Sequence, residues 1–314
     1  DVTLDELRKQ GYKGFYIAIG AQGGRGIGVE GEDAKGVIHG VDFLRDVNSG
    51  KKTDVSGKVV VVGGGNVAVD VARTAIRENT ESVTMYCLEN EKEMPASREE
   101  VDEALEEGVK LMNGWGPKRI IVKDGKVAGV EFKKCVSVFE NGKFAPKYDE
   151  NDTMTVDADY VLLTVGQSVV WGDLLKGSKV ELNRNNTAKA DGFTYQTAEP
   201  DIFVGGDVFT GPKFAIDAIA AGKQAAISLH RFVQPGQSLV LGRDRRHFIE
   251  LDKDNIDVKG FDNTPRQTSG IDRSKEKTFR DARLAFTEEQ LKKETERCLG
   301  CGATVVDQAA CVGC

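Results

Sequence analysis

The chain has 314 residues, of which 39% are hydrophobic and 30% charged, and its formal net charge is −7. This length allows about two domains, and this balance of hydrophobic and charged residues excludes a disordered chain. The acidic charge argues against a nucleic-acid partner, which needs clustered Lys and Arg, and no apolar run approaches the roughly 18 residues of a membrane helix.

The 36 glycines gather where short apolar runs end, which is typical of strands that lead into helices. The run 58–62 is apolar on both faces, as in a central parallel strand covered on two sides. Ser97 and Glu100 have the spacing of a capping box and predict the start of a helix. The first half of the chain is therefore predicted to form strands at 15–19, 58–62 and 83–88, helices at 41–47 and 66–78, and a helix that begins after Ser97.

After Gly108 the sequence alternates between apolar and polar residues, which predicts antiparallel strands over 117–139. Asp124-Gly125 and Asn141-Gly142 are predicted hairpin turns. The remaining predicted elements are strands at 160–165 and 202–204, an Ala-rich helix at 214–232, an irregular stretch at 235–286, and a final helix with capping-box spacing at Thr287 and Gln290. The predicted fold class is α/β, with an antiparallel insert and a cysteine-bearing tail.

The segment 63–68 reads Gly-Gly-Gly-Asn-Val-Ala and fits the pattern G-x-G-x-x-A. It follows a buried strand and opens a helix, which is the context of a dinucleotide-binding turn. The first glycine permits the tight turn, the third lets the backbone approach a pyrophosphate, and the helix N-terminus offers N–H groups to the phosphates. A tight turn without a ligand is the alternative. The residues expected at the dinucleotide are Gly63, Gly64, Gly65, Asn66 and Val67.

Glu89 follows the second strand of this unit, where an acidic residue accepts hydrogen bonds from the ribose 2′-hydroxyl and repels a 2′-phosphate. The nearest arginines, Arg77 and Arg98, lie on the preceding helix and beyond the turn. The alternative is that Glu89 is a solvated turn residue. We therefore predict that NADH is preferred over NADPH.

A second glycine turn, Gly205-Gly206-Asp207-Val208, lies between a strand and a helix and resembles the C-terminal flavin motif of two-dinucleotide flavoproteins. That resemblance implies that Asp207 holds the ribityl chain of FAD, and it places the residues that begin the next helix at the isoalloxazine edge. Alternatively, Asp207 is only an N-terminal capping carboxylate. The FAD residues implied by the resemblance are Gly20, Ala21, Gly206, Asp207, Ala215 and Ile216.

Further segments extend the resemblance over almost the whole chain: 92–96 (Lys-Glu-Met-Pro-Ala), 115–118 (Trp-Gly-Pro-Lys), 165–167 (Val-Gly-Gln) and 218–226. With them, the chain resembles the small (beta) subunit of glutamate synthase and related NAD(P)H-dependent, FAD-containing iron–sulfur oxidoreductases. The resemblance implies a Rossmann-like NAD(P)H domain at 36–165 inserted into an FAD domain at 1–35 and 166–235. A linker at 236–286 and an iron–sulfur segment at 287–314 follow. Gly166 and Gln167 are expected at the crossover near the nicotinamide.

Two departures from this family shape the prediction. The family usually carries an upstream FAD fingerprint with its own G-x-G-x-x-G, and the sequence, which begins at Asp1 rather than Met, does not include it. The other half of the FAD domain is therefore expected to be either truncated or on another polypeptide. NADPH-using relatives carry arginines at the positions held here by Leu88, Glu89 and Glu91, which also favours NADH. Hydride transfer between stacked rings needs positioning rather than an acid or base, so no catalytic side chain is expected.

Six cysteines are too few for a disulfide scaffold and suggest a reducing cytoplasm. Cys87 and Cys135 stand alone and are predicted to be small buried hydrophobes rather than a redox pair. Two Cys-x-x-Cys pairs end the chain and predict a metal or cluster site. The flavoprotein resemblance favours an iron–sulfur cluster, with zinc or free thiols as the alternatives. The predicted ligands are Cys298, Cys301, Cys311 and Cys314.

These features together predict an electron-input subunit that takes hydride from NADH to FAD and passes electrons through iron–sulfur clusters. The expected acceptor is a larger partner subunit or ferredoxin, and neither nucleic acid nor a membrane is expected. Two alternatives stay open: another NADH:acceptor oxidoreductase built on the same module, and a non-catalytic nucleotide-binding module with a zinc knuckle.

Overall fold

The computed structural model describes residues 2–243 and 262–298, together with 252, 255, 257, 259 and 260. The chain divides into two compact units, Asp1–Arg243 and Asp244–Cys314. The limits of the finer domains expected from the sequence stay a prediction. No helix among the described residues is long and apolar enough to span a membrane.

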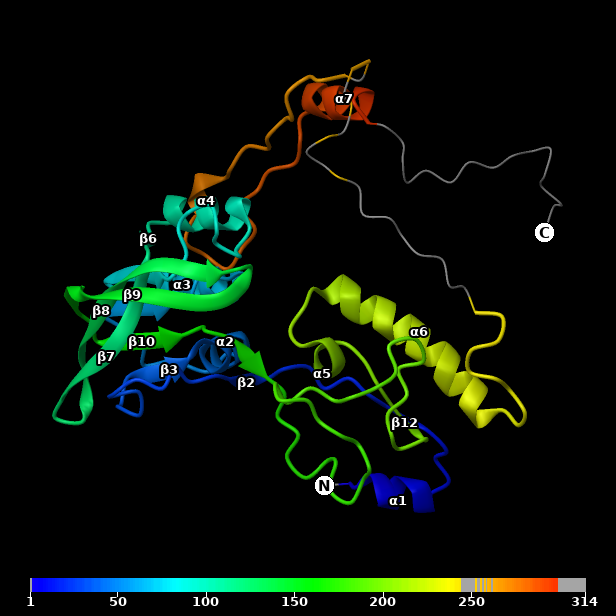
Figure 1. Ribbon diagram of the computed structural model, residues 1–314. Coiled ribbons are helices and arrows are strands. Elements are labelled where there is room, and N and C mark those ends of the chain that lie inside the picture. Colours follow the sequence, from blue (N-terminus) through cyan, green and yellow to red (C-terminus); the bar gives the residue numbers. More distant parts are fainter. Residues whose placement is uncertain are drawn as a thin grey trace. The chain divides into compact units, whose positions relative to one another are not determined.

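One part of the first unit is built on a five-stranded parallel sheet (Figure 1). Its central strand alternates between two cores, because Val59 and Val61 pack toward the helices while Val60 and Val62 pack toward an antiparallel sheet. In sheet order the strands are β3 (Val37–His39), β10 (Tyr160–Leu163), β4 (Lys58–Val62), β5 (Ser82–Cys87) and β6 (Lys110–Asn113). The helices are α2 (Gly40–Asn48), α3 (Asn66–Arg77) and α4 (Arg98–Glu106). These confirm the elements predicted between 41 and 105.

The antiparallel insert is a three-stranded sheet in the order β7-β8-β9, also as predicted. Asp124 and Gly125, with φ of 52° and 75°, and Asn141 and Gly142, with φ of 51° and 72°, form its two turns. Positive φ at both central residues is the geometry of the type I′ turn that matches the twist of the strands. The strands are β7 (Trp115–Lys123), β8 (Lys126–Glu140) and β9 (Lys143–Asp157).

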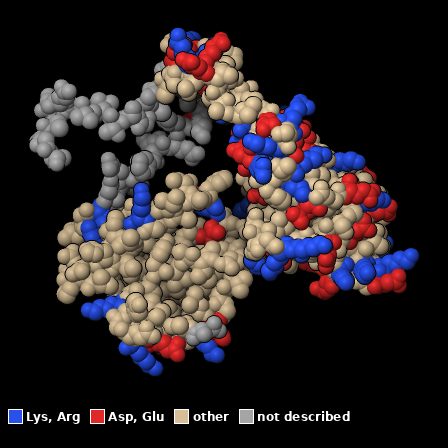
Figure 2. Space-filling view, turned by 180° about the vertical axis from the view of Figure 1, so that it is seen from behind, with Lys and Arg blue, Asp and Glu red and all other residues tan. Residues whose placement is uncertain are grey.

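A segment near the start of the first unit pairs with one from its last quarter: β1 (Phe15–Ile17) and β12 (Ile202–Val204) form a parallel pair. A separate antiparallel pair is formed by β2 (Gly23–Gly24) and β11 (Gln167–Ser168). In the space-filling view, this part of the chain shows few charged side chains (Figure 2). Its helices are α1 (Leu4–Lys9), α5 (Asp207–Thr210) and α6 (Ala215–Val233).

The described part of the second unit contains the predicted final helix, α7 (Glu288–Glu296), and the 3-10 turn η2 (Arg273–Lys275). Thr287 and Gln290 form the full capping box: the Thr287 hydroxyl accepts from the Gln290 N–H, and the Gln290 side chain accepts from the Thr287 N–H. The capping-box prediction for α4 is only half right. Ser97 caps the helix through its hydroxyl, but its own N–H donates to Asn66 instead of Glu100.

Glu107 joins α3 to the end of α4 through two arginines. Arg73 and Arg77 lie 2.6 Å and 2.7 Å from its carboxylate, whose side chain is 11% exposed. Burial alone would raise the pKa of Glu107, but the hydrogen bonds from Arg77 and Arg73 outweigh it and hold the pKa below the ordinary value of 4.5. The carboxylate therefore stabilises the fold above that ordinary pKa, and this contribution is lost as the pH falls through the folded-state pKa.

We expect Glu107→Gln to lower the free energy of unfolding at pH 7 by about 2 kcal/mol, the contribution of hydrogen bonds to a charged group. Below the folded-state pKa, wild type and variant should converge, because the protonated carboxyl also lacks the charge. Urea unfolding at pH 7 and over a series of lower pH values measures both, with Glu106→Gln as the exposed neighbouring control. A difference that does not shrink as the pH falls would show that charge is not the cause.

Candidate functional site

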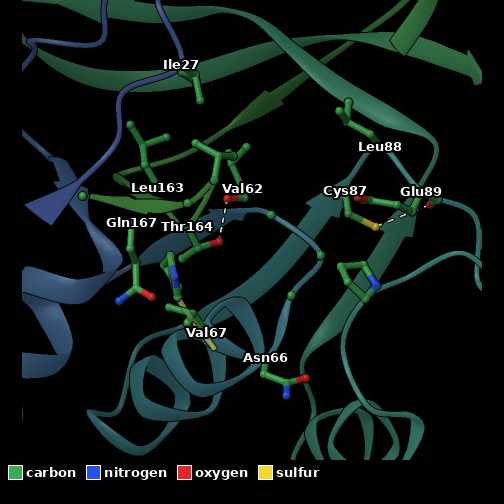
Figure 3. A pocket seen from close by; sticks show the side chains of 18 of the residues that line it. Ile27, Val62, Asn66, Val67, Cys87, Leu88, Glu89, Leu163, Thr164 and Gln167 are labelled. Carbon is green, nitrogen blue, oxygen red and sulfur yellow. Dashed lines mark hydrogen bonds between the residues drawn. The ribbon is translucent and has the colours of Figure 1, made fainter. Parts of the chain in front are cut away.

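A cavity of about 1090 Å³ opens at the carboxyl ends of β4, β5 and β10 in the first unit. This end of a parallel sheet is where ligands bind in open α/β folds. Figure 3 shows its lining: Asn66 and Val67 begin α3, Leu88 and Glu89 follow β5, and Gln167 follows β10.

The glycine turn forms the floor of this cavity and leaves no room for a side chain at its first position. Gly63 has a φ of 145°, and a Cβ there would stand 2.2 Å from the Oγ1 of Thr164. That hydroxyl donates to the carbonyl of Val62 at 2.6 Å (Figure 3), so the next strand closes tightly over the turn. Gly63 is thus required by the packing of β10 against β4.

The third glycine differs, because nothing lies within 4 Å of the Cβ position of Gly65 and its φ is −91°. Gly65 is the N-cap of α3, and no side chain caps that helix. The positive end of the α3 dipole and its first N–H groups therefore meet the open cavity, which suits a phosphate. Ala68 is fully buried, as expected of the small residue that lets the helix approach the strand.

Glu89 folds back over the glycine turn from the end of β5. A Cβ on Gly64 would stand 2.8 Å from its Oε2 atom, so carboxylate and turn are in close contact. The backbone of Glu89 is anchored as well, since its carbonyl accepts from the Nδ2 of Asn113 at 3.1 Å and the N–H of Gly114 at 3.2 Å. The half-buried carboxylate is thereby held at one side of the cavity.

The residues predicted at the crossover also line the cavity. Gly166 has a φ of 118°, its carbonyl accepts from the N–H of Arg25 at 3.2 Å, and Gln167 pairs with Gly24. The structure thus gathers around one cavity all eight residues predicted for the nicotinamide nucleotide: Gly63, Gly64, Gly65, Asn66, Val67, Glu89, Gly166 and Gln167. Their roles in binding stay predictions.

The residues expected at FAD lie outside the lining of that cavity. Gly20, with φ of 72°, faces Asp207, whose Oδ2 lies 3.9 Å from the Cβ position of the glycine. Asp207 begins the short helix α5, which comes before α6 in the chain. Its Oδ1 accepts a hydrogen bond from the N–H of Lys213 at 3.3 Å. The other four predicted residues lie nearby in sequence or at the next helix: Ala21 is buried, Gly206 caps α5, and Ala215 and Ile216 begin α6 in exposed positions.

Sequence reasoning missed one wall of the cavity. It comes from Leu88 and from the antiparallel sheet, which supplies Pro117 of β7 and Phe144, Pro146 and Tyr148 of β9. The alternation of 144, 146 and 148 was the available signal, because it places the three on one face of a strand. Nothing in the sequence indicated which face of the hairpin meets the glycine turn.

The thiols of the first unit are not suited to redox chemistry. Cys87 and Cys135 are buried and free, as predicted. Burial, helped by the charge of Glu89, raises the pKa of the Cys87 thiol to about 12, and burial also raises the pKa of Cys135. A protonated thiol is a poor nucleophile. The Cys87 thiol donates to the carbonyl of Glu89, and the Cys135 thiol donates to the carbonyl of Ser137.

Of the four predicted cluster ligands, Cys298 alone falls within the described residues. It is exposed, carries a free thiol, and comes directly after Arg297, the C-cap of α7. Cys301, Cys311 and Cys314 lie outside the described residues, so their arrangement stays a prediction.

Comparison with known proteins bears on this arrangement. Residues 1–222 match the family model described as "Pyridine nucleotide-disulphide oxidoreductase". The NADP(+)-dependent formate dehydrogenase subunit beta of Moorella thermoacetica is 32% identical over 96% of this chain and 44% of its own length. The NADPH-Fe(3+) oxidoreductase subunit beta of Geobacter sulfurreducens is 30% identical over 96% of this chain and 50% of its own length. The glutamate synthase [NADPH] small chain of Escherichia coli is 31% identical over 74% of this chain and 53% of its own length. The chain spans about half the length of these curated relatives.

Solved structures share the fold. Mycobacterium tuberculosis FprA in complex with NADPH superposes with a TM-score of 0.62 at 18% identity, over 74% of this chain and 66% of that one. The thioredoxin reductase of T. acidophilum superposes with a TM-score of 0.53 at 24% identity, over 69% of this chain and 65% of that one. The predicted α/β fold of a two-dinucleotide-binding flavoprotein and the resemblance to the small subunit of glutamate synthase are both confirmed.

Proposed function

The chain belongs to the pyridine nucleotide-disulphide oxidoreductase family, and on that premise we propose that it is the electron-input part of a larger oxidoreductase. It binds NADH at the cavity, positions the nicotinamide for hydride transfer to FAD, and passes electrons through an iron–sulfur cluster to a partner. The observation that carries this proposal is the glycine turn, with its uncapped helix end and its carboxylate, around one cavity.

Three regions of the cavity lining each suit one part of the nucleotide. The N–H groups that begin α3 suit the pyrophosphate, and the Glu89 carboxylate suits the hydroxyls of the adenosine ribose. Gly166 and Gln167 line the opposite strand end, where the nicotinamide would lie. No acid or base is needed, because hydride transfer depends on the relative position of two rings.

The preference for NADH rests on the charges near Glu89. The two arginines nearest to it in sequence are both engaged in ion pairs: Arg77 with Glu107 at 2.7 Å, and Arg98 with Asp102 at 2.9 Å and with Glu91. A 2′-phosphate would meet the carboxylate without a clamp from either of them. The names of the relatives carry NADP or NADPH, so this preference would distinguish the chain from them.

FAD supplies the chemistry of accepting a hydride and releasing electrons one at a time. The residues present fit its ribityl part, because Asp207 presents a carboxylate oxygen toward Gly20, and the glycine leaves the space between them open. Asp207 would hold a ribityl hydroxyl there, and Gly20, Ala21, Gly206, Ala215 and Ile216 would border the flavin. The rest of the FAD site would come from polypeptide beyond this part of the fold.

Electrons would leave through the four cysteines that follow α7. Four thiolates are the donor set of an iron–sulfur cluster, and the same set can also hold zinc. The relatives named as beta subunits or small chains support an acceptor on a larger partner subunit. Ferredoxin is the alternative acceptor.

An anaerobic absorption spectrum of the natural assembly, before and after NADH, tests the proposal. We expect the flavin absorbance to bleach, with iron and acid-labile sulfide present in the protein. A colourless, zinc-containing assembly that does not respond to NADH or NADPH would overturn it in favour of a non-catalytic nucleotide-binding module.

A further inference from the structure

The end of the β8–β9 hairpin extends beyond the three-stranded sheet. Pairing of β7 with β8 stops at Trp115 and Lys134, whereas β8 and β9 stay paired from there to Glu140 and Lys143. Residues 135–148 therefore form a two-stranded ribbon, which we call the distal ribbon. The pairing register of this ribbon shifts near Lys134 and Ser137, so its ladder is irregular.

One face of the distal ribbon lines the nucleotide cavity. Phe144, Pro146 and Tyr148, all on β9, are lining residues of that cavity. Tyr148 is half-buried, whereas Phe144 is 64% exposed and meets Phe139 edge-on with ring centroids 6.2 Å apart. Tyr148 is thus the more firmly held of the two rings.

Tyr148 lies against the ammonium of Lys133 and the backbone of Gly116. The ammonium of Lys133 lies 4.2 Å from its ring centroid and is itself paired with Glu150 at 2.7 Å. On another side, a Cβ on Gly116 would stand 2.6 Å from Tyr148 and 2.7 Å from Leu88. Glycine at 116 thus leaves room for the tyrosine ring and the leucine to approach the same backbone. Leu88 immediately precedes Glu89 in the chain.

From this placement we infer that Tyr148 is the aromatic wall against which the adenine of the dinucleotide packs. The inference rests on the proposed function, which puts the adenosine ribose at Glu89. The base attached to that ribose then lies beside Leu88 and Tyr148. The ammonium of Lys133 covers one face of the ring and Gly116 approaches it from another side, so the base would meet the part of the ring that lines the cavity. Every purine offers a π-face for such stacking.

The electrostatics of the ring suit this role. Burial, followed by the charges of Cys135, Glu150 and Glu89, raises the pKa of Tyr148. The phenol therefore stays neutral at pH 7 and adds no charge beside the base. An apolar wall at this place explains why the ribbon keeps its aromatic and proline side chains on the cavity face.

The test compares three ligands on the full chain by calorimetry: NADH, ADP-ribose, which lacks the nicotinamide, and reduced nicotinamide mononucleotide, which lacks the adenosine. We expect Tyr148→Ala to weaken NADH and ADP-ribose about 5- to 150-fold, the range of base stacking on an aromatic side chain. The mononucleotide should bind as it does to wild type, and Tyr148→Phe should restore both adenosine-containing ligands. Tyr148→Leu keeps an apolar side chain and replaces the Ala variant if that variant is unstable.

Phe139→Ala is the matched control, because this ring belongs to the same ribbon but does not line the cavity. Its affinities should equal those of wild type. If Tyr148→Ala binds ADP-ribose normally while wild type binds NADH, the adenine wall is wrong and the proposed function stands. If it weakens all three ligands equally, the ring does not act on the adenine. If wild type binds neither NADH nor ADP-ribose, the proposed function fails and this inference fails with it.

Discussion

Gly65→Ala is expected to weaken NADH binding at least tenfold while leaving the melting temperature within about 2 °C of wild type. The new methyl group meets no protein atom, since nothing lies within 4 Å of that position, and a φ of −91° is open to alanine. It would instead occupy the space that the pyrophosphate needs beside the first N–H groups of α3. Calorimetric titration with NADH and thermal unfolding of the same samples measure the two effects.

Gly63→Ala gives the contrasting control two residues away. Its φ of 145° and the Oγ1 of Thr164 at 2.2 Å leave no place for a Cβ, so this variant should lose about 1–3 kcal/mol of stability. If Gly65→Ala binds NADH as tightly as wild type, the pyrophosphate does not lie at the start of α3. If it instead melts as low as Gly63→Ala, its loss of binding would be a consequence of misfolding.

Glu89→Arg is expected to shift the preference between the two nicotinamide nucleotides from NADH to NADPH. Loss of charged hydrogen bonds to the ribose hydroxyls should weaken NADH about 10- to 100-fold, from about 1.5–3 kcal/mol per such bond. The guanidinium should at the same time strengthen NADPH through a bidentate contact with the 2′-phosphate. Dissociation constants for both nucleotides, measured at one ionic strength, give the ratio.

Glu93→Arg is the matched control, because it makes the same change of charge in the same turn. Glu93 is exposed, and its carboxylate accepts from Asn90 rather than touching the glycine turn. Its effect on the NADH to NADPH ratio should be less than about twofold, since exposed charges are screened. Tighter binding of NADPH than of NADH by wild type would show that the preference for NADH is wrong.

Sequence alone determined the features whose cause is local. The hairpin turns at Asp124-Gly125 and Asn141-Gly142 follow from residues that accept positive φ. The run 58–62 is a central strand because both of its faces are apolar. Gly65 and Glu89 were identified because their roles depend on positions within one strand–turn–helix unit, where spacing fixes geometry.

Tertiary structure decided the features that depend on which distant segments meet. Thr164 closes over Gly63 across about a hundred residues of sequence. The side chain of Asn66 accepts the hydrogen bond from the Ser97 N–H that Glu100 would accept in a complete capping box. Tyr148 and Leu88 can both approach the backbone of Gly116 because that residue lacks a side chain. A periodic pattern tells which face of a strand is buried, but the partner of that face is chosen by packing of the whole chain. The glycine turn was therefore visible in the sequence, and the aromatic wall beside it was not.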